Sequence, residues 1–201
     1  MDDTQHDATM NNPLTKFEEW WSLARESSLL NQKNAVCLST INEMGFPSSR
    51  FVDLKSVDSD GVVFCSSYDS RKGEDIENNP KAGITAWWDH VGYQIRVLGS
   101  AVKMSEDDAI RYWETRSRSA RIATLSFDQS QILEGFDQLD ERYCITESEY
   151  SNRPIPRPSN WGAYKVVPLL VEFLEFKETR LHHRELFEIE NGEWSRSLLQ
   201  P

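Results

Sequence analysis

Short β-prone runs separated by tight-turn residues recur along most of this 201-residue chain. The most compact example lies between Arg50 and Ser66, where Asp58-Ser59-Asp60-Gly61 separates two such runs, 50–57 and 62–66. Turns this short join antiparallel strands, whereas parallel strands need a crossover of a dozen or more residues. The chain is therefore expected to build an antiparallel sheet, and a doubly wound fold is disfavoured.

The same patterns predict the other elements. Further strands are expected at 35–41, 48–57, 84–88, 93–102, 166–176 and 185–189, the last followed by an Asn191-Gly192 turn. Helices are expected at 13–29, from Arg71 to a stop at Asn78-Asn79-Pro80, from Ser105 to Arg116, and from about Gln129 to Cys144. Hairpin strands with few helices indicate an α+β fold, a closed or nearly closed antiparallel β-barrel with peripheral helices.

Composition limits the class of protein. The length fits one domain, predicted at 13–201, after a polar and aperiodic segment, 1–12, that predicts a disordered N-terminal tail. A net charge of -11 argues against a general nucleic-acid binder. Cys37, Cys65 and Cys144 have no paired spacing, so we expect no disulfide framework and no metal, and a reducing cytoplasm. The acidic N-terminus and the short apolar run 166–173 indicate no membrane segment.

Four basic side chains surround the 50–66 hairpin and the helix predicted after it: Arg50, Lys55, Arg71 and Lys72. Ser70 would cap that helix, whose free backbone N–H groups and neighbouring cations outline a phosphate site. The chain contains neither a Gly-x-Gly-x-x-Gly nor a Gly-x-x-x-x-Gly-Lys-Ser/Thr motif, so the site is not of the Rossmann or P-loop type. The alternative interpretation is that all four cations are solvated charges at strand and helix ends.

An ordered set of short motifs resembles the pyridoxine (pyridoxamine) 5′-phosphate oxidase family. The set comprises Arg50-Phe51-Val52-Asp53-Leu54-Lys55, Ser70-Arg71-Lys72, Glu77-Asn78-Asn79-Pro80, Gln94, Gln129-Ser130, Trp161-Gly162 and Arg180-Leu181-His182-His183-Arg184. The match runs from about residue 13 to 201, and its last segment is the most specific. The resemblance implies an FMN-binding split β-barrel and a homodimer with FMN at the interface. It also implies oxidation of pyridoxamine or pyridoxine 5′-phosphate to pyridoxal 5′-phosphate, with hydride transfer to FMN and reoxidation by O2 to H2O2.

The resemblance further implies residue roles. FMN contacts are expected from Arg50, Phe51, Val52, Asp53, Leu54, Lys55, Cys65, Ser66, Arg71, Lys72, Gln94, Gln129, Ser130, Leu174 and Arg184. Substrate contacts are expected from Lys55, Tyr112, Arg116, Ala120, Arg180 and His182, with Arg180 and His182 as the catalytic pair that orients the substrate over the flavin.

Spacing adds two expectations of its own. Tyr112 and Arg116, four residues apart, would share one helix face and grip a phosphate together. Arg180 and His182, two apart on an extended segment, would point to the same side, with His183 pointing away. The alternatives are a surface aromatic–cation pair for the first two and a solvent-facing histidine for His182.

Several positions depart from the family pattern that the resemblance implies. The family usually has a basic, substrate-covering segment before the first helix, where this chain has Asp7-Ala8-Thr9-Met10-Asn11-Asn12, and Ala120 stands where the family has a serine at the substrate phosphate. Leu174 replaces a tryptophan near the flavin, while Cys65 and Asp53 replace a tyrosine and an aliphatic residue. Two alternatives therefore stay open: a paralogue that oxidises another compound, of the phenazine-precursor type, and a flavin-binding module without turnover.

Overall fold

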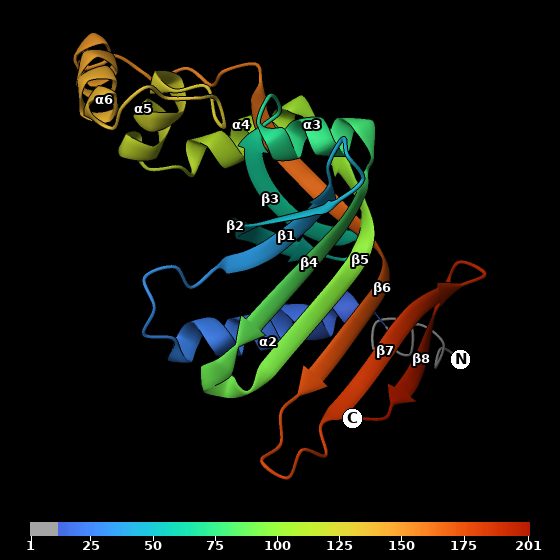
Figure 1. Cartoon of the computed structure of the whole chain (residues 1–201). Helices are drawn as coiled ribbons and strands as arrows, with labels where there is room; N and C mark the ends of the chain where they lie inside the picture. Colours follow the sequence, from blue (N-terminus) through green and yellow to red (C-terminus); the bar gives the residue numbers. More distant parts are fainter. Residues whose placement is uncertain (1–11) are drawn as a thin grey trace, which may run out of the picture.

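The chain folds around one antiparallel sheet of eight strands, in a computed structural model that describes residues 12–201. The strands are arranged in the order β3-β2-β1-β4-β5-β6-β7-β8, and β3 also pairs with β6. This extra pairing closes the first six strands of that order into a barrel, while β7 and β8 extend the sheet beyond it (Figure 1). The predicted antiparallel barrel is confirmed.

Most element bounds agree with the sequence predictions. The strands are β1 (Ala35–Ile41), β2 (Pro47–Asp58), β3 (Gly61–Ser67), β4 (Lys81–Trp88), β5 (Tyr93–Lys103), β6 (Trp161–Glu175), β7 (His183–Glu190) and β8 (Glu193–Leu199). The helices are α2 (Pro13–Ser27), α3 (Arg71–Asn78), α4 (Glu106–Glu114), α5 (Arg118–Ser126) and α6 (Asp137–Glu149), with a 3-10 turn, η1 (Asp89–Val91).

Helix α2 contributes to the barrel core. Its apolar stripe, which includes Phe17, Trp21 and Ala24, is buried together with strand residues such as Leu38 and Phe64. The helix begins after Asn12, whose side chain accepts a hydrogen bond from the N–H of Leu14. The predicted tail, 1–12, lies outside the described residues except for this cap.

The segment between β5 and β6 differs from the sequence prediction. The helix expected through Arg116 ends at Glu114, and a new helix, α5, begins after Ser117, whose hydroxyl accepts from the N–H of Ala120. The helix expected from about Gln129 to Cys144 is wrong in its start, because α6 runs from Asp137 to Glu149. Residues 127–136 form a loop in which Ser130 has a positive φ of 75°, a conformation that interrupts any helix.

Strand β6 connects the two ends of the barrel. At its start Gly162 pairs with Ser66 of β3, and near its end Leu174 pairs with Gln94 of β5 and with Arg184 of β7. Within residues 12–201, no helix is long and apolar enough to cross a membrane, and no cluster of three or more His, Cys, Asp or Glu side chains is placed to hold a metal ion.

Candidate functional site

A buried ammonium lies at the junction of β3 and α3. The Lys72 side chain donates through Nζ to Ser66 Oγ and Ser70 Oγ, both at 3.0 Å, and Lys72 is only 7% exposed. Gln129 Oε1 accepts from Ser66 Oγ at 3.2 Å and from the N–H of Ser67 at 3.3 Å. No carboxylate of the described chain forms an ion pair with Lys72. A buried charge without a counter-ion is costly, so this site calls for an anion.

The pKa of Lys72 reflects that environment. Burial and, to a smaller extent, the positive charge of Arg50 together lower the pKa of Lys72 to about 8, while Asp75 opposes the shift. Arg50 is itself held by Thr40, Ser48 and Asp75, with its Nη1 donating to Thr40 Oγ1 at 2.6 Å. The second cation therefore stands near Lys72 in a fixed orientation.

The N-terminus of α3 adds backbone donors to this cluster. Ser70 occupies the predicted N-cap position, but its hydroxyl donates to the carbonyl of Ser67 and forms no capping bond. The first N–H groups of α3 thus keep their capacity to bind an anion. Arg71 is exposed at the same turn and lines a separate hollow with Ser48 and Glu74.

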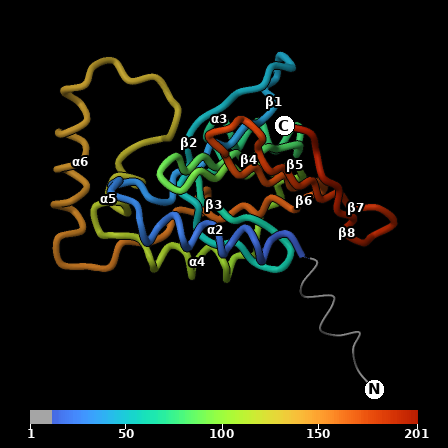
Figure 2. Tube along the Cα trace, turned by 90° about the horizontal axis from the view of Figure 1, so that it is seen from below, coloured from blue at the N-terminus to red at the C-terminus, as the bar shows by residue number. Residues whose placement is uncertain are grey.

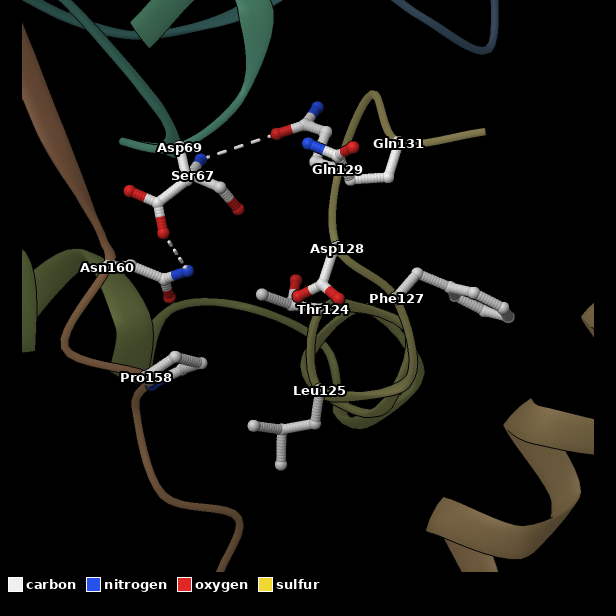
Figure 3. A pocket seen from close by; sticks show the side chains of 10 residues that line it. All are labelled: Ser67, Asp69, Thr124, Leu125, Phe127, Asp128, Gln129, Gln131, Pro158 and Asn160. Carbon is white, nitrogen blue, oxygen red and sulfur yellow. Dashed lines mark hydrogen bonds between the residues drawn. The ribbon is translucent and has the colours of Figure 1, made fainter. Parts of the chain in front are cut away.

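A cavity of about 380 Å³ opens beside the Lys72 cluster. It brings together five of the predicted site residues, namely Cys65, Ser66, Arg116, Ala120 and Gln129, with walls completed by Ser67, Ala123, Thr124, Phe127 and Trp161. A neighbouring cavity of about 390 Å³ shares Ser67, Thr124, Phe127 and Gln129 with it. Figure 3 shows this second cavity, in which Gln129 reaches toward Ser67 from the loop that follows α5.

Tyr112 lies on α4, whereas Arg116 lies in the short connection between α4 and α5. Because α4 ends at Glu114, they do not share one helix face, and that prediction is wrong. Tyr112 instead shares a hydrogen bond with Ser56 Oγ at 2.7 Å. Arg116 donates to the carbonyl of Ala120 and to Thr124 Oγ1, and its guanidinium lies 4.9 Å from the Trp161 ring centroid. Its buried Nε has no partner in the described chain and remains a free donor.

Strand β2 contributes charged side chains and an open edge. Lys55 lies at a β-bulge and donates to Asp53 Oδ2 at 2.5 Å. From 47 to 53, β2 pairs with β1 alone, because pairing with β3 begins at Leu54. The Leu54 side chain is in the core and Phe51 is exposed, with Val52 half-buried between them. Backbone groups on the open edge can therefore bind a flat polar ring.

The Cys65 thiol lines the cavity in its protonated form. Burial is the main cause that raises the pKa of this thiol to about 12, with a small contribution from Asp53, while the charges of Lys55 and Arg116 oppose the shift. The side chain is consequently a neutral wall of the cavity near neutral pH.

A second group of predicted residues lies where β5, β6 and β7 meet. Gln94, Leu174 and Arg184 occupy adjacent register positions on the three strands. Arg184 donates to Glu172 Oε1 from Nε at 3.0 Å and from Nη2 at 2.6 Å, and Arg96 donates to Glu172 Oε2 at 2.9 Å. Sequence reasoning missed Arg96 and Glu172, although Arg96 follows Gln94 by two residues and so shares its face of the strand.

The loop before β7 carries Arg180 and His182, and it is not extended. Arg180 has a positive φ of 67° and its N–H donates to the carbonyl of Lys177, so the argument from strand alternation is wrong. His182 Nδ1 accepts from the N–H of Lys177 at 3.1 Å, which leaves Nε2 as the protonated nitrogen of a neutral ring. His183 is instead the first residue of β7, and its Nδ1 lies 3.4 Å from Glu175 Oε2.

These two groups are far apart within one chain. Gly162, opposite Ser66, and Leu174, opposite Gln94, are twelve positions apart on β6, which corresponds to about 40 Å along a strand. Figures 1 and 2 show the same separation, with α5 and α6 on one side of the molecule and the β7–β8 hairpin on the other. We call them the Lys72 half-site and the Arg184 half-site. One chain does not bring them together.

The lowered pKa of Lys72 predicts two opposite pH responses. Between about pH 8 and the ordinary lysine pKa near 10.5, the unfolded chain binds more protons at Lys72 than the folded chain, so this residue makes unfolding less favourable as pH rises. Binding of a phosphate at this site needs the charged ammonium and should weaken over the same range. Thermal melts and phosphate-ligand titrations of the ligand-free protein from pH 7 to 10 measure both trends. A Lys72→Met variant should lose both.

Comparison with known proteins identifies the family. Residues 25–140 match the family model described as pyridoxamine 5′-phosphate oxidase, and 161–201 match a pyridoxine 5′-phosphate oxidase C-terminal dimerisation region. A pyridoxine/pyridoxamine 5′-phosphate oxidase of Acaryochloris marina is 37% identical over 94% of this chain and 86% of its own length. The chain belongs to the pyridoxamine 5′-phosphate oxidase family and is an oxidoreductase. The family implies a flavin, and the C-terminal match supports a homodimer.

Solved structures agree on the fold. PhzG from Burkholderia lata, in complex with tetrahydrophenazine-1-carboxylic acid, superposes with a TM-score of 0.89 at 28% identity, covering 95% of this chain and 93% of its own. An FMN-binding protein from Nostoc punctiforme superposes with a TM-score of 0.74 over 94% and 97% of the two chains, and at 19% identity it shows the fold alone.

Proposed function

We propose that the protein is an FMN-dependent oxidase that converts pyridoxamine or pyridoxine 5′-phosphate to pyridoxal 5′-phosphate. The observation that carries the cofactor assignment is the buried Lys72 ammonium, which has hydroxyl partners but no carboxylate partner among residues 12–201. A phosphate monoester supplies the missing negative charge, and the uncapped N-terminus of α3 supplies further donors to it.

The remaining cofactor residues divide by chemistry. The FMN phosphate and ribityl chain would be held by polar and basic side chains, namely Arg50, Lys55, Ser66, Arg71, Lys72, Gln129 and Ser130. The open edge of β2 from Phe51 to Asp53 would contact the flavin ring. Leu54 would contribute only its backbone, since its side chain lies in the core. Bound FMN would supply the hydride acceptor, and O2 would reoxidise it to give H2O2.

Substrate residues come from both half-sites. Lys55, Tyr112 and Arg116 would bind the substrate phosphate beside Ala120, with the unpartnered Arg116 Nε as one donor. Arg180 and His182 would orient the carbon that bears the amine or alcohol, and His182 Nε2 offers a proton to that group. Trp161 and Phe127 form an aromatic part of the cavity wall.

A complete site needs two copies of the chain. The Arg184 half-site lies at the opposite end of β6 from Lys72. We propose that in a homodimer its residues complete the site of the partner subunit, namely Gln94, Leu174, Arg180, His182 and Arg184. Two equivalent sites result from one two-fold axis. The free thiols of Cys37, Cys65 and Cys144 suit a cytoplasmic protein.

A second candidate function rests on the substrate side of the site. Ala120 offers no hydroxyl to a phosphate, and PhzG, solved in complex with tetrahydrophenazine-1-carboxylic acid, superposes at a TM-score of 0.89. On this basis the alternative is an oxidase of a phenazine precursor that lacks a phosphate group.

Anaerobic mixing tests the proposal. The FMN-loaded protein should lose its yellow absorbance with pyridoxamine or pyridoxine 5′-phosphate and regain it when air is admitted, with formation of pyridoxal 5′-phosphate and H2O2. Rapid bleaching only by a dihydrophenazine-type carboxylic acid would favour the second candidate. Flavin that stays oxidised with every substrate would instead indicate a binding module without turnover.

A further inference from the structure

An acidic side chain lies among the cations proposed to hold the substrate. Lys55 Nζ donates to Asp53 Oδ2 at 2.5 Å, and this is the one side-chain hydrogen bond of Asp53 within residues 12–201. The Asp53 side chain is 48% exposed and that of Lys55 is 24% exposed. An ion pair this open adds little to stability, so the fold itself gives no reason for a carboxylate at this position.

The charge of Asp53 acts on the wall of the substrate cavity. Arg116 and Cys65 both line the cavity of about 380 Å³. Burial lowers the pKa of Arg116, and Cys65 and Asp53 oppose that shift. Burial raises the pKa of the Cys65 thiol, and Asp53 adds to the shift. Arg116 donates to the carbonyl of Ala120 and to Thr124 Oγ1, and it forms no ion pair within the described residues. The carboxylate that acts on this cavity therefore comes from β2.

The two proposed phosphate positions differ in their counter-ions. Lys72, at the cofactor position, has no carboxylate partner in the described part of the chain. Lys55, at the substrate position, has one at 2.5 Å. The two cations Lys55 and Arg116, together with Asp53, leave one net positive charge for the substrate. A singly charged anion balances that charge, whereas a doubly charged phosphate leaves a negative charge beside Asp53 uncompensated.

We propose that Asp53 is a specificity-determining residue, which lowers the affinity of the substrate pocket for a doubly charged phosphate relative to a singly charged anion such as a carboxylate. The inference rests on the proposed substrate pocket of Lys55, Tyr112 and Arg116. Coulomb energy is proportional to the charge of the ligand, so Asp53 repels a dianion twice as strongly as a monoanion at the same place. Asp53 stands where the resemblance to the family implies an aliphatic residue, so this repulsion is a feature of this chain.

A purely structural role for the same carboxylate predicts the opposite result. If Asp53 only held Lys55 in position, its removal would loosen the lysine and weaken the binding of every anion. If Asp53 offsets charge, its removal frees Lys55 Nζ and strengthens anion binding, more so for a dianion. The sign of the change therefore distinguishes a structural ion pair from one that determines specificity.

Two ligands that share a ring and differ in charge test the proposal. Phenyl phosphate is doubly charged at about pH 7.5, because the second pKa of a phosphate monoester is about 6, and benzoate is singly charged. Calorimetric titration of the FMN-loaded protein measures both dissociation constants without turnover. Asp53→Asn keeps the shape of the side chain and should lower the Kd for phenyl phosphate roughly tenfold and that for benzoate roughly threefold. Asp53→Leu should change both in the same direction.

Asp60→Asn is the matched control. Asp60 is an exposed aspartate of the same hairpin and pairs with Lys165 at 2.6 Å. It precedes Gly61, the first residue of β3, and four strand positions, about 13 Å, separate Gly61 from Cys65 at the cavity wall. That distance exceeds the Debye length of about 8 Å at physiological salt, so neither Kd should change.

Steady-state kinetics give an independent measurement. With pyridoxamine 5′-phosphate as substrate, Asp53→Asn should lower KM with little change in kcat, because the pocket holds the phosphate equally in the ground state and the transition state. A lower kcat with unchanged KM would instead place Asp53 in the chemical step and contradict the proposal.

The binding outcomes separate this inference from the proposed function. Weaker or unchanged binding of phenyl phosphate by both Asp53 variants would overturn the role of Asp53, as would an equal change for the two anions or no binding of either anion to any of the proteins. The predicted shift in binding without oxidation of any phosphorylated pyridoxine would support the role of Asp53 and reject the substrate. Turnover of pyridoxamine 5′-phosphate without that shift would do the reverse.

Discussion

Replacing Lys72 with methionine is expected to raise the Kd for FMN by about 100-fold or more while the barrel stays folded. The variant removes a charge-assisted donor from the phosphate and keeps a side chain of similar length, and hydrogen bonds to charged groups contribute roughly 1.5–3 kcal/mol each. Quenching of flavin fluorescence on titration with the flavin-free protein measures the change.

The same Lys72→Met variant should bind FMN more weakly but should be more stable to heat without flavin. Lys72 is 7% exposed and has no carboxylate partner in the part of the chain that the structure describes, so a methionine in its place removes a buried, unpaired charge and should raise the melting temperature of the flavin-free protein. Lys103→Met is the matched control, because Lys103 is exposed and pairs with Glu77 at 2.6 Å. FMN affinity that is unchanged in Lys72→Met would reject the phosphate assignment.

Two inactive variants are expected to restore activity when combined in one dimer. Lys72→Met disables the Lys72 half-site, and His182→Ala disables the opposite half-site, so each homodimer should turn over at least about 100-fold more slowly than the native enzyme. In a mixed dimer, one of the two sites contains both changes and the other contains neither. Random association should recover about a quarter of the native rate, since half of the dimers are mixed and each has one intact site.

Co-expression of the two variants with different affinity tags isolates the mixed dimer. H2O2 release on addition of pyridoxamine 5′-phosphate, normalised to the amount of dimer, then measures its activity, which should be about half the native rate because one of the two sites is intact. As a control, a mixture of Lys72→Met with Lys72→Met bearing the second tag should remain inactive. If the mixed dimer is no more active than the mean of its parents, each site is built within a single chain.

The sequence predicted those parts of the fold that depend on residues close together in the chain. The 50–66 hairpin, the helix from Arg71 to Asn78 and the strand from 35 to 41 are confirmed, because turn residues, caps and alternation act over a few positions. The motifs ending in Arg180-Leu181-His182-His183-Arg184 also indicated the family, which the comparisons confirm.

The misplaced elements show the limit of local patterns. Helix α5 depends on Ser117 as a cap only twelve residues after Ser105, the cap of α4, and both signals lie within a helix-prone stretch. Arg180 adopts a positive φ, which is uncommon for residues other than glycine, and its N–H closes a turn onto Lys177. No periodic pattern in the sequence predicts the start of α5 at Ser117 or the turn at Arg180.

By itself, the sequence determined which residue types are available: cations around one hairpin, an apolar stripe on the first helix, and a terminal motif typical of one oxidase family. Only the tertiary structure decided that Lys72 is buried without a counter-ion and that the predicted site divides into halves at opposite ends of β6. The physical reason is that burial and proximity follow from strand pairing over long sequence separations, such as Ser66 with Gly162. This strand register separates the two half-sites and so determines where a second subunit would have to bind. The spacing of residues along the sequence does not determine that register.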